Sequence, residues 1–120
     1  MNVIKNDNCI FFDVDGTLVM WRPTPEYTQA VYVKCPYTNK KEMLYLNQDH
    51  VKLLEKAKGR GKHVIVWSHA GWQWAEAVVT ALNLEHLVDD VMSKPIEYVD
   101  DVSIQDWDSL NLYIKNYFGG

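Results

Sequence analysis

The sequence has few cysteines, and neither is placed to hold a metal ion. Cys9 and Cys35 are the only two in the 120-residue chain. Zinc sites and disulfide frameworks need cysteines in closely spaced pairs or in larger even sets. Unpaired thiols are typical of reducing compartments. The scarcity of cysteine therefore predicts a cytoplasmic location and argues against a thiolate metal site.

Long apolar runs and a basic excess are also missing. No stretch approaches the roughly 20 apolar residues that span a bilayer. Residues 1–8 lack the basic-then-apolar order of a secretory signal. We therefore expect no membrane segment. The formal net charge of −4 disfavours a protein that coats nucleic acid, because phosphate binding usually leaves a basic surplus.

The residues that are present are enough for one globular domain. The chain is 48% hydrophobic, which is ordinary for a soluble fold, and its length suits one small core. It shows no internal repeat and no low-complexity tract. We therefore treat residues 1–120 as a single domain.

Residues 9–18 carry the strongest local pattern. Four apolar or nearly apolar residues run into Asp13, and Asp15 follows before Gly16. A short uninterrupted apolar run predicts a strand buried on both faces of a parallel sheet. Open α/β sheets bind ligands at the carboxyl ends of such strands. Two neighbouring carboxylates repel each other, so the pair favours a bound cation, and oxygen ligands of this kind suit Mg²⁺.

The rest of the chain alternates strand and helix patterns. Two β-rich segments within about residues 30–46 are separated by turn-forming residues and predict a β-hairpin. Asn47 is placed to cap a helix that ends near Gly59. A strand over residues 63–67 and a helix over residues 72–82 follow. Strand, helix and strand in this order predict an α/β fold with a parallel sheet.

The last third of the chain predicts one more strand and one more helix. Residues 96–99 (Ile-Glu-Tyr-Val) are expected to form the third strand of the sheet, whereas Asp89-Asp90 is expected to be a solvated turn. Asp106 is a candidate cap for a final helix. The apolar positions of that helix recur at helical spacing and are Trp107, Leu110, Ile114 and Phe118.

Polar residues follow each predicted strand. Residues 13–18 (Asp-Val-Asp-Gly-Thr-Leu) are followed by Ser68, Lys94 and Asp100-Asp101. This order resembles the four signatures of the haloacid-dehalogenase superfamily of phosphohydrolases, and the match spans residues 9–101. The resemblance implies a Rossmann-like three-layer α/β sandwich with a mainly parallel sheet. It also implies a small β-hairpin flap and no cap domain.

The same resemblance assigns roles to residues. Asp13 is the implied nucleophile, and Asp15 is the implied general acid, which then acts as base. Lys94 is implied to neutralise Asp13 and the incoming phosphate. The implied substrate-binding residues are Thr17, Ser68, His69 and Lys94, although His69 is equally suited to stabilising its own loop. The implied ligands of Mg²⁺ are Asp13, Asp15, Asp100 and Asp101.

The expected function is hydrolysis of phosphate monoesters through an aspartyl-phosphate on Asp13. Candidate substrates are phosphorylated small molecules and phosphorylated polymer ends, with nucleotides and polynucleotide ends first. Two alternatives stay open: a catalytically silent metal-binding or interaction module, and a phosphotransferase that uses an acceptor other than water. The five tryptophans either stack on a nucleobase or pack in the core. Trp21, Trp67 and Trp72 flank the expected site in the sequence, and Trp74 is close by.

Overall fold

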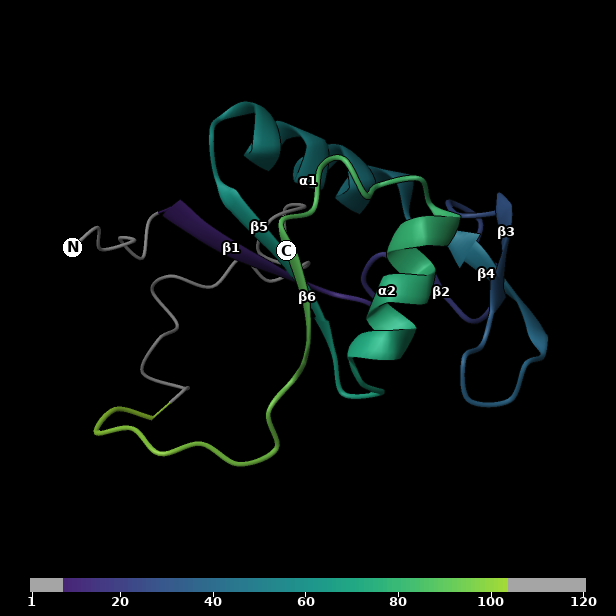
Figure 1. Cartoon of the computed structure of the whole chain (residues 1–120). Coiled ribbons are helices and arrows are strands. Elements are labelled where there is room, and N and C mark those ends of the chain that lie inside the picture. Colours follow the sequence, from purple (N-terminus) through teal and green to yellow (C-terminus); the bar gives the residue numbers. More distant parts are fainter. Residues whose placement is uncertain (1–7, 104–120) are drawn as a thin grey trace.

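The structure is a computed structural model that describes residues 8–103. It contains a parallel sheet, a small antiparallel sheet and two helices (Figure 1). The elements in chain order are β1 (Cys9–Asp13), β2 (Val19–Met20), β3 (Ala30–Lys34), β4 (Lys41–Leu46), α1 (Gln48–Gly59), β5 (His63–Ser68), α2 (Trp72–Ala81) and β6 (Asp90–Ser93).

Strands β1, β5 and β6 form the parallel sheet in that spatial order. The apolar runs predicted as strands become β1 and β5, but β1 is not buried on both faces as expected, because Phe11 is exposed. Asp13 lies beside Trp67, and Ser68 lies beside Ser93. Because the three strands are parallel, their carboxyl ends meet at one edge of the sheet. The predicted α/β fold with a parallel sheet is therefore confirmed.

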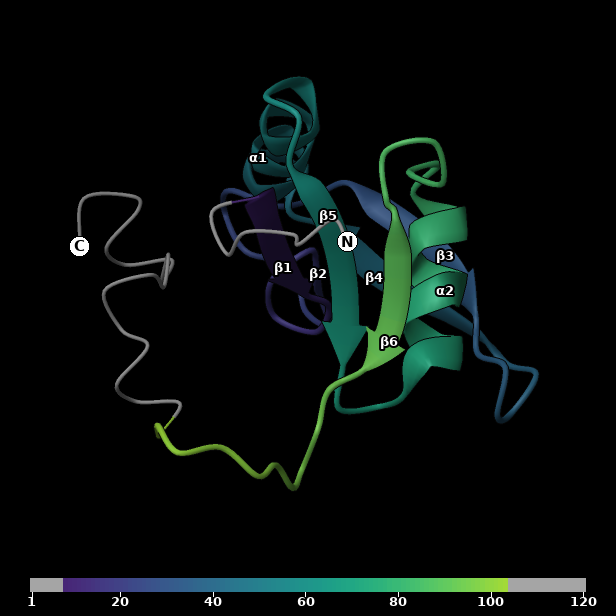
Figure 2. The ribbon, with the colours of Figure 1, turned by 60° about the vertical axis from the view of Figure 1, so that its left-hand side comes forward.

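Both helices cover the same face of this sheet. Each crossover moves one strand further in the same direction, so right-handed connections place α1 and α2 on one side, as Figure 2 shows. The core residues Phe12, Val64 and Val66 point to this covered side and are buried. None of the helices within residues 8–103 has the length and apolarity needed to cross a membrane.

The opposite face of the parallel sheet carries exposed apolar side chains. Phe11 and Met92 are 43% and 39% exposed there, and the Phe11 ring lies 4.5 Å from that of Trp67, centroid to centroid. The final helix expected after Asp106 would supply a third layer, but its residues lie outside the described part of the chain. The three-layer arrangement therefore stays a prediction.

The predicted β-hairpin is confirmed as β3 and β4, which pair antiparallel. Strand β2 adds to the other edge of β4, so the hairpin is attached to the segment that leaves the Asp13–Asp15 region. Its tip closes through hydrogen bonds from Cys35 N to Lys40 O and from Asn39 N to Cys35 O. Between β2 and α1 the described residues hold this hairpin and no cap domain.

Helix α1 begins as its sequence predicts. The Asn47 side chain accepts a hydrogen bond from His50 N at 3.1 Å, which satisfies one of the amide groups that a helix leaves unpaired at its start. The helix ends at Gly59, and Gly61 then takes a φ of +79°. That angle suits glycine because it has no Cβ to clash. Helix α2 spans Trp72–Ala81, one residue shorter than expected.

The predicted third strand over residues 96–99 is wrong. The structure forms the third strand earlier, as β6 (Asp90–Ser93), which pairs with β5 along Ile65–Ser68. Ile96 is 86% exposed, and residues 94–103 take no regular secondary structure. Helix α2 packs against β6.

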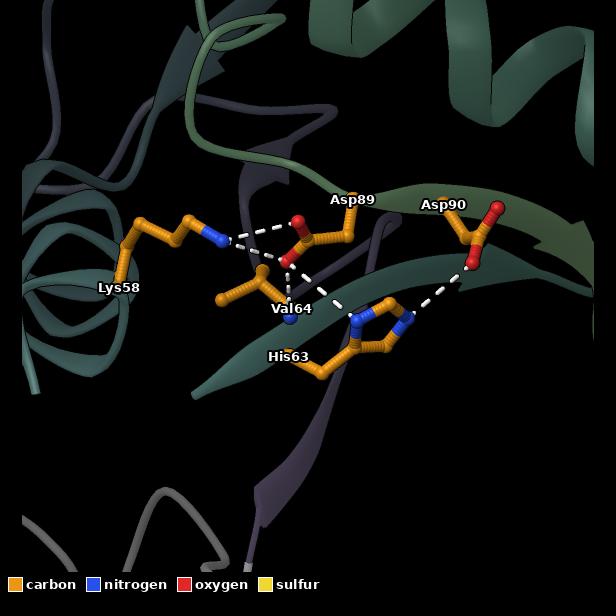
Figure 3. Close-up of polar contacts among 5 residues, drawn as sticks. All are labelled: Lys58, His63, Val64, Asp89 and Asp90. Atoms are coloured by element: carbon orange, nitrogen blue, oxygen red, sulfur yellow. Dashed lines mark hydrogen bonds and ion pairs between the residues drawn. The ribbon is translucent and has the colours of Figure 1, made fainter. Parts of the chain in front are cut away.

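Asp89 and Asp90 explain the difference, because they are not a solvated turn. The Asp89 carboxylate accepts hydrogen bonds from Lys58 Nζ at 2.8 Å and from Val64 N at 2.8 Å. Asp90 Oδ2 lies 3.2 Å from His63 Nε2 (Figure 3). Two acidic residues can therefore begin a strand, since each carboxylate has a partner on a neighbouring element. We call these five residues the β6 clasp.

The β6 clasp predicts a pH-dependent contribution to stability. The hydrogen bond from Lys58, followed by that from Val64 N, lowers the pKa of Asp89 below its usual value. An acid whose pKa is lower in the folded state stabilises the fold above its unfolded pKa, and this stability is lost as pH falls through the folded pKa. We expect Asp89→Asn to lower the free energy of unfolding by about 1 kcal/mol at pH 7.

Urea denaturation at pH 7 and at pH 3 measures this effect. The difference between wild type and Asp89→Asn should shrink at pH 3, because the wild-type carboxylate is then increasingly protonated. Glu55→Gln, which changes an exposed carboxylate on α1, is the matched control and should leave the midpoint unchanged. Equal midpoints for wild type and Asp89→Asn at pH 7 would contradict a stabilising role for the clasp.

Candidate active site

A tight turn follows β1 and fixes the two aspartates that begin the motif. Val14 O accepts hydrogen bonds from the amides of Thr17, Leu18 and Val19. Gly16 takes a φ of +78° within this turn, and a residue with a Cβ would be strained there. Val14 and Leu18 are fully buried, so the turn is anchored to the core. The carboxylates on either side of Val14 are therefore held in separate, defined places.

Asp13 lies at the carboxyl end of β1 between two polar partners. Thr17 Oγ1 donates to Asp13 Oδ2 at 3.1 Å, and Lys94 Nζ lies 3.8 Å from Asp13 Oδ1. The Lys94 backbone is placed by its own amide, which donates to Ser68 O at 2.9 Å. The structure thus brings together three residues that the sequence predicts to share a site: Asp13, Thr17 and Lys94.

The contact between Asp13 and Lys94 contributes little to stability. Their side chains are 35% and 31% exposed, and ion pairs this accessible to water are worth about 0–1 kcal/mol. Lys94 Nζ also lies 5.5 Å from the centroid of the Trp67 ring, within the range of a cation–π contact. Lys94 therefore places a positive charge beside Asp13. Asp13 Oδ1 accepts no hydrogen bond from any described residue, whereas Oδ2 accepts one from Thr17.

Asp15 has different partners from Asp13. The indole N–H groups of Trp21 and Trp74 donate to Asp15 Oδ1 at 2.8 and 3.1 Å. The two indole rings are stacked, with centroids 5.9 Å apart and planes inclined by 20°. Among the described residues no group donates to Asp15 Oδ2. This oxygen is therefore available to exchange a proton or to bind an ion.

Sequence reasoning left the role of the tryptophans open, and the structure gives a different answer for each. Trp74 is buried in the core, yet its N–H reaches Asp15. Trp21 and Trp72 are exposed, and Trp67 lies under Lys94. Trp74 stands four residues before Val78 on the apolar stripe of α2, so its burial was readable from the sequence. Its hydrogen bond to a residue 59 positions away was not.

Strand β5 ends on a serine whose side chain is turned away from solvent. Ser68 is buried, and its Oγ accepts a hydrogen bond from Ala70 N at 3.0 Å. His69 is exposed in the loop that follows. The first amide of α2, Trp72 N, donates to Ser93 Oγ at 3.0 Å. Ser68 therefore shapes the loop in this structure, and its binding of a phosphoryl oxygen stays a prediction, as does that of His69.

Asp100 and Asp101 are not brought to Asp13. Both are exposed, and the chain after β6 leads away from α2 in both ribbon views (Figures 1 and 2). Asp100 Oδ1 accepts from Val102 N at 2.9 Å, and this hydrogen bond lowers the pKa of Asp100. Within residues 8–103 no three His, Cys, Asp or Glu side chains gather closely enough to hold a metal ion. The expected four-aspartate ligand set is thus not assembled here.

Two further residues position the site through contacts that the sequence did not predict. His50, expected to be an ordinary helix residue, is buried with Nδ1 2.7 Å from Thr17 O. The same Nδ1 lies 3.1 Å from Asn47 Nδ2, so His50 joins the turn after β1 to the start of α1. The Tyr37 hydroxyl donates to Ala70 O at 2.6 Å and so joins the tip of the hairpin to the loop after β5. The contacts with Thr17 O and Ala70 O link segments more than 30 positions apart, and no local pattern reveals them.

Comparison of the chain with the profiles of known protein families and with curated proteins gave no match. The chemistry of the site is therefore argued from its own geometry. That geometry consists of a carboxylate beside a cation and a second carboxylate held by two indoles.

The contact of Tyr37 explains a glycine and gives a prediction. Gly71 has a φ of +105°, and a Cβ at this position would lie 2.5 Å from the Tyr37 hydroxyl. We expect Gly71→Ala to lower the free energy of unfolding by about 1–3 kcal/mol through backbone strain and this clash. Thermal unfolding of the purified variant measures the loss.

Gly59→Ala is the matched control for this substitution. Gly59 lies at the end of α1 with a φ outside the left-handed region, and no atom would lie within 4 Å of an added Cβ. Alanine there should be neutral or slightly stabilising, because it favours helix more than glycine does. A Gly71→Ala variant as stable as wild type would show that the hairpin and the loop after β5 are not held as closely as the structure places them.

Proposed function

We propose that this chain is a phosphatase of the haloacid-dehalogenase type, which hydrolyses phosphate monoesters through an aspartyl-phosphate on Asp13. The observation that carries the proposal is the approach of Lys94 Nζ to within 3.8 Å of Asp13 Oδ1. These residues come from opposite ends of the described chain, and both are predicted members of the motif. The parallel sheet and the hairpin beside the site support the same assignment.

In the first step, Asp13 attacks phosphorus. Thr17 holds Asp13 Oδ2 at 3.1 Å, so Oδ1 is the oxygen free to form the new P–O bond. The bond from phosphorus to the leaving alcohol breaks, and that oxygen takes a proton from Asp15. Lys94 offsets the negative charge of the phosphoryl group as it approaches a carboxylate.

The second step reverses the role of Asp15. Water attacks phosphorus of the aspartyl-phosphate, Asp15 takes a proton from that water, and the P–O bond to Asp13 breaks to release inorganic phosphate. Asp15 Oδ1 is held by two indole N–H groups, which leaves Oδ2 to carry the proton in both steps. A fixed carboxylate that neither rotates nor drifts serves both directions of transfer.

The donor atoms at the site fit Mg²⁺ in kind. Asp13 and Asp15 are hard oxygen ligands, and Mg²⁺ commonly takes one or two carboxylates from a protein while waters and substrate phosphate complete its coordination. When bound, the ion would supply positive charge toward the phosphoryl oxygens. Asp13 is the residue that would hold it, because Asp15 Oδ1 accepts from two indole N–H groups and Asp15 Oδ2 carries the proton. Asp100 or Asp101 would join Asp13 only if residues 94–103 took another path.

The placement of Asp100 and Asp101 favours a second candidate. A site without a third acidic residue suits a binding module that keeps the fold but lacks turnover. This alternative predicts no release of phosphate from any ester. Assays with 4-nitrophenyl phosphate and with a panel of sugar phosphates, nucleotides and phosphorylated oligonucleotides, each with Mg²⁺ and with a chelator, separate the two candidates.

Asp13→Asn tests the nucleophile. We expect it to lower kcat for 4-nitrophenyl phosphate by a factor on the order of 10⁴ or more, because an amide oxygen does not replace a carboxylate as nucleophile. The variant keeps the size of the side chain, so circular dichroism should match that of wild type. Activity equal to wild type would remove Asp13 from the mechanism.

Lys94→Ala tests the cation. Loss of a fixed charge beside the phosphoryl group should lower kcat/KM by about 10²- to 10³-fold, while the melting temperature changes little because the ion pair is accessible to water. Lys52→Ala, which removes an exposed lysine from α1, is the matched control and should leave kcat/KM as it is. Equal losses in both variants would point to a general effect of net charge rather than to the contact with Asp13.

A further inference from the structure

A pocket of about 310 Å³ opens between the tip of the hairpin and α2, directly beside Asp15. Trp21, Tyr37 and Trp74 supply aromatic walls, and Asp15 and Glu42 supply its two acidic groups. Pockets that bind small organic ligands begin at about 300 Å³ and are mostly apolar with a few placed polar groups. This pocket is thus large enough for a single planar ring system.

Contacts between separate elements hold the pocket open. The Tyr37 hydroxyl donates to Ala70 O at 2.6 Å and lies 3.2 Å from Gln73 Oε1, so the tip of the hairpin is joined to the start of α2. Trp21 and Trp74 are held by their hydrogen bonds to Asp15. The exposed ring of Trp21 therefore presents a fixed face, on which an aromatic ligand can stack.

Glu42 is an unusual residue for this position. It pairs with Val33 across the hairpin, and Val33 is buried, so Glu42 projects from the inner side of β4. Its side chain is half-buried, yet it makes no hydrogen bond and no ion pair with any residue in 8–103. Neither of its carboxylate oxygens is enclosed, since no buried side-chain oxygen among the described residues lacks a partner. The carboxylate is therefore open at the pocket, where a ligand with N–H groups would take the place of water.

The charges of the pocket indicate which part of a substrate enters it. Asp15 and Glu42 make it negative, whereas the cation Lys94 stands beside Asp13. A phosphoryl group is therefore favoured on the Asp13 side, and the group on the far side of the leaving oxygen is directed past Asp15 into the pocket. That group meets aromatic faces and one carboxylate that accepts hydrogen bonds.

We propose that the pocket binds the leaving group of the phosphate ester and selects a planar heteroaromatic ring that carries N–H donors, as in a nucleoside monophosphate with an amino-bearing base. The assignment rests on the proposed phosphatase function and specifies its substrate class. Stacking on the Trp21 ring provides affinity. Hydrogen bonds from N–H groups to the Glu42 carboxylate provide selectivity, because charge-assisted bonds of this kind are stronger than neutral ones.

Matched substrates test the selectivity. The 3′- and 5′-monophosphates of guanosine and inosine differ by one amino group on the base, and glycerol phosphate has no ring. With Mg²⁺ present, we expect kcat/KM for at least one guanosine phosphate to exceed that for the matching inosine phosphate by about tenfold. Glycerol phosphate should be the poorest substrate of the set. Equal kcat/KM values for all three kinds of ester would overturn the proposal.

Glu42→Gln tests the residue that carries the proposal. It keeps the shape of the side chain, and the guanosine-to-inosine ratio of kcat/KM should fall toward one, since a neutral amide accepts the amino group more weakly. Glu55→Gln makes the same change on the exposed side of α1 and should keep the wild-type ratio. A ratio that is unchanged in Glu42→Gln would overturn the role of Glu42.

Binding of free guanosine separates failure of the pocket from failure of the phosphatase. Calorimetry needs no turnover, so it reports on the pocket alone. Guanosine that binds wild type and binds Glu42→Gln about tenfold more weakly, without hydrolysis of any ester, would support the pocket and refute the phosphatase. Hydrolysis of glycerol phosphate, without any binding of guanosine and without a preference for ring-bearing esters, would support the phosphatase and refute the pocket.

Discussion

Parallel pairing of β1, β5 and β6 is the constraint on which the site depends. The register places Asp13 beside Trp67 and Ser68 beside Ser93, so the residues that follow each strand meet at one edge. The Lys94 amide donates to Ser68 O and so extends the hydrogen bonding between β5 and β6 by one residue. The Lys94 side chain then lies toward Asp13. Lys94 lies near Asp13 because of the register in which β6 pairs with β5.

The same register is fixed from the other end of the sheet. Asp89 accepts from Val64 N, and Lys58 holds the same carboxylate from α1. A strand that slipped by one residue would separate these groups and move every β6 side chain to the opposite face. The β6 clasp and the edge that carries Asp13 thus lie at opposite ends of the pairing between β5 and β6. This is why two acidic residues at the start of β6 matter to a lysine at its end.

Sequence patterns predicted the elements that depend on local signals. The apolar runs of β1 and β5, the hairpin turn and the Asn47 cap all appear where they were expected. Strand β6 was missed because Asp89 and Asp90 interrupt its apolar pattern, and their partners Lys58 and His63 are more than 25 positions away. At the site, motif order predicted Asp13 with Thr17 and Lys94. The expected position of Asp100 depended on a strand over residues 96–99, which the structure does not form.

Asp13 and Asp15 show why a short motif needs the whole fold to become a site. The two carboxylates are separated by one residue, yet one contacts a threonine and a lysine while the other contacts two indoles. Their different partners arise because Val14 is buried between them and the turn closes onto its carbonyl. A pair that shared one environment would compete for one charge state. Separate partners give the two carboxylates different surroundings, which the proposed division of roles between a nucleophile and a proton carrier requires.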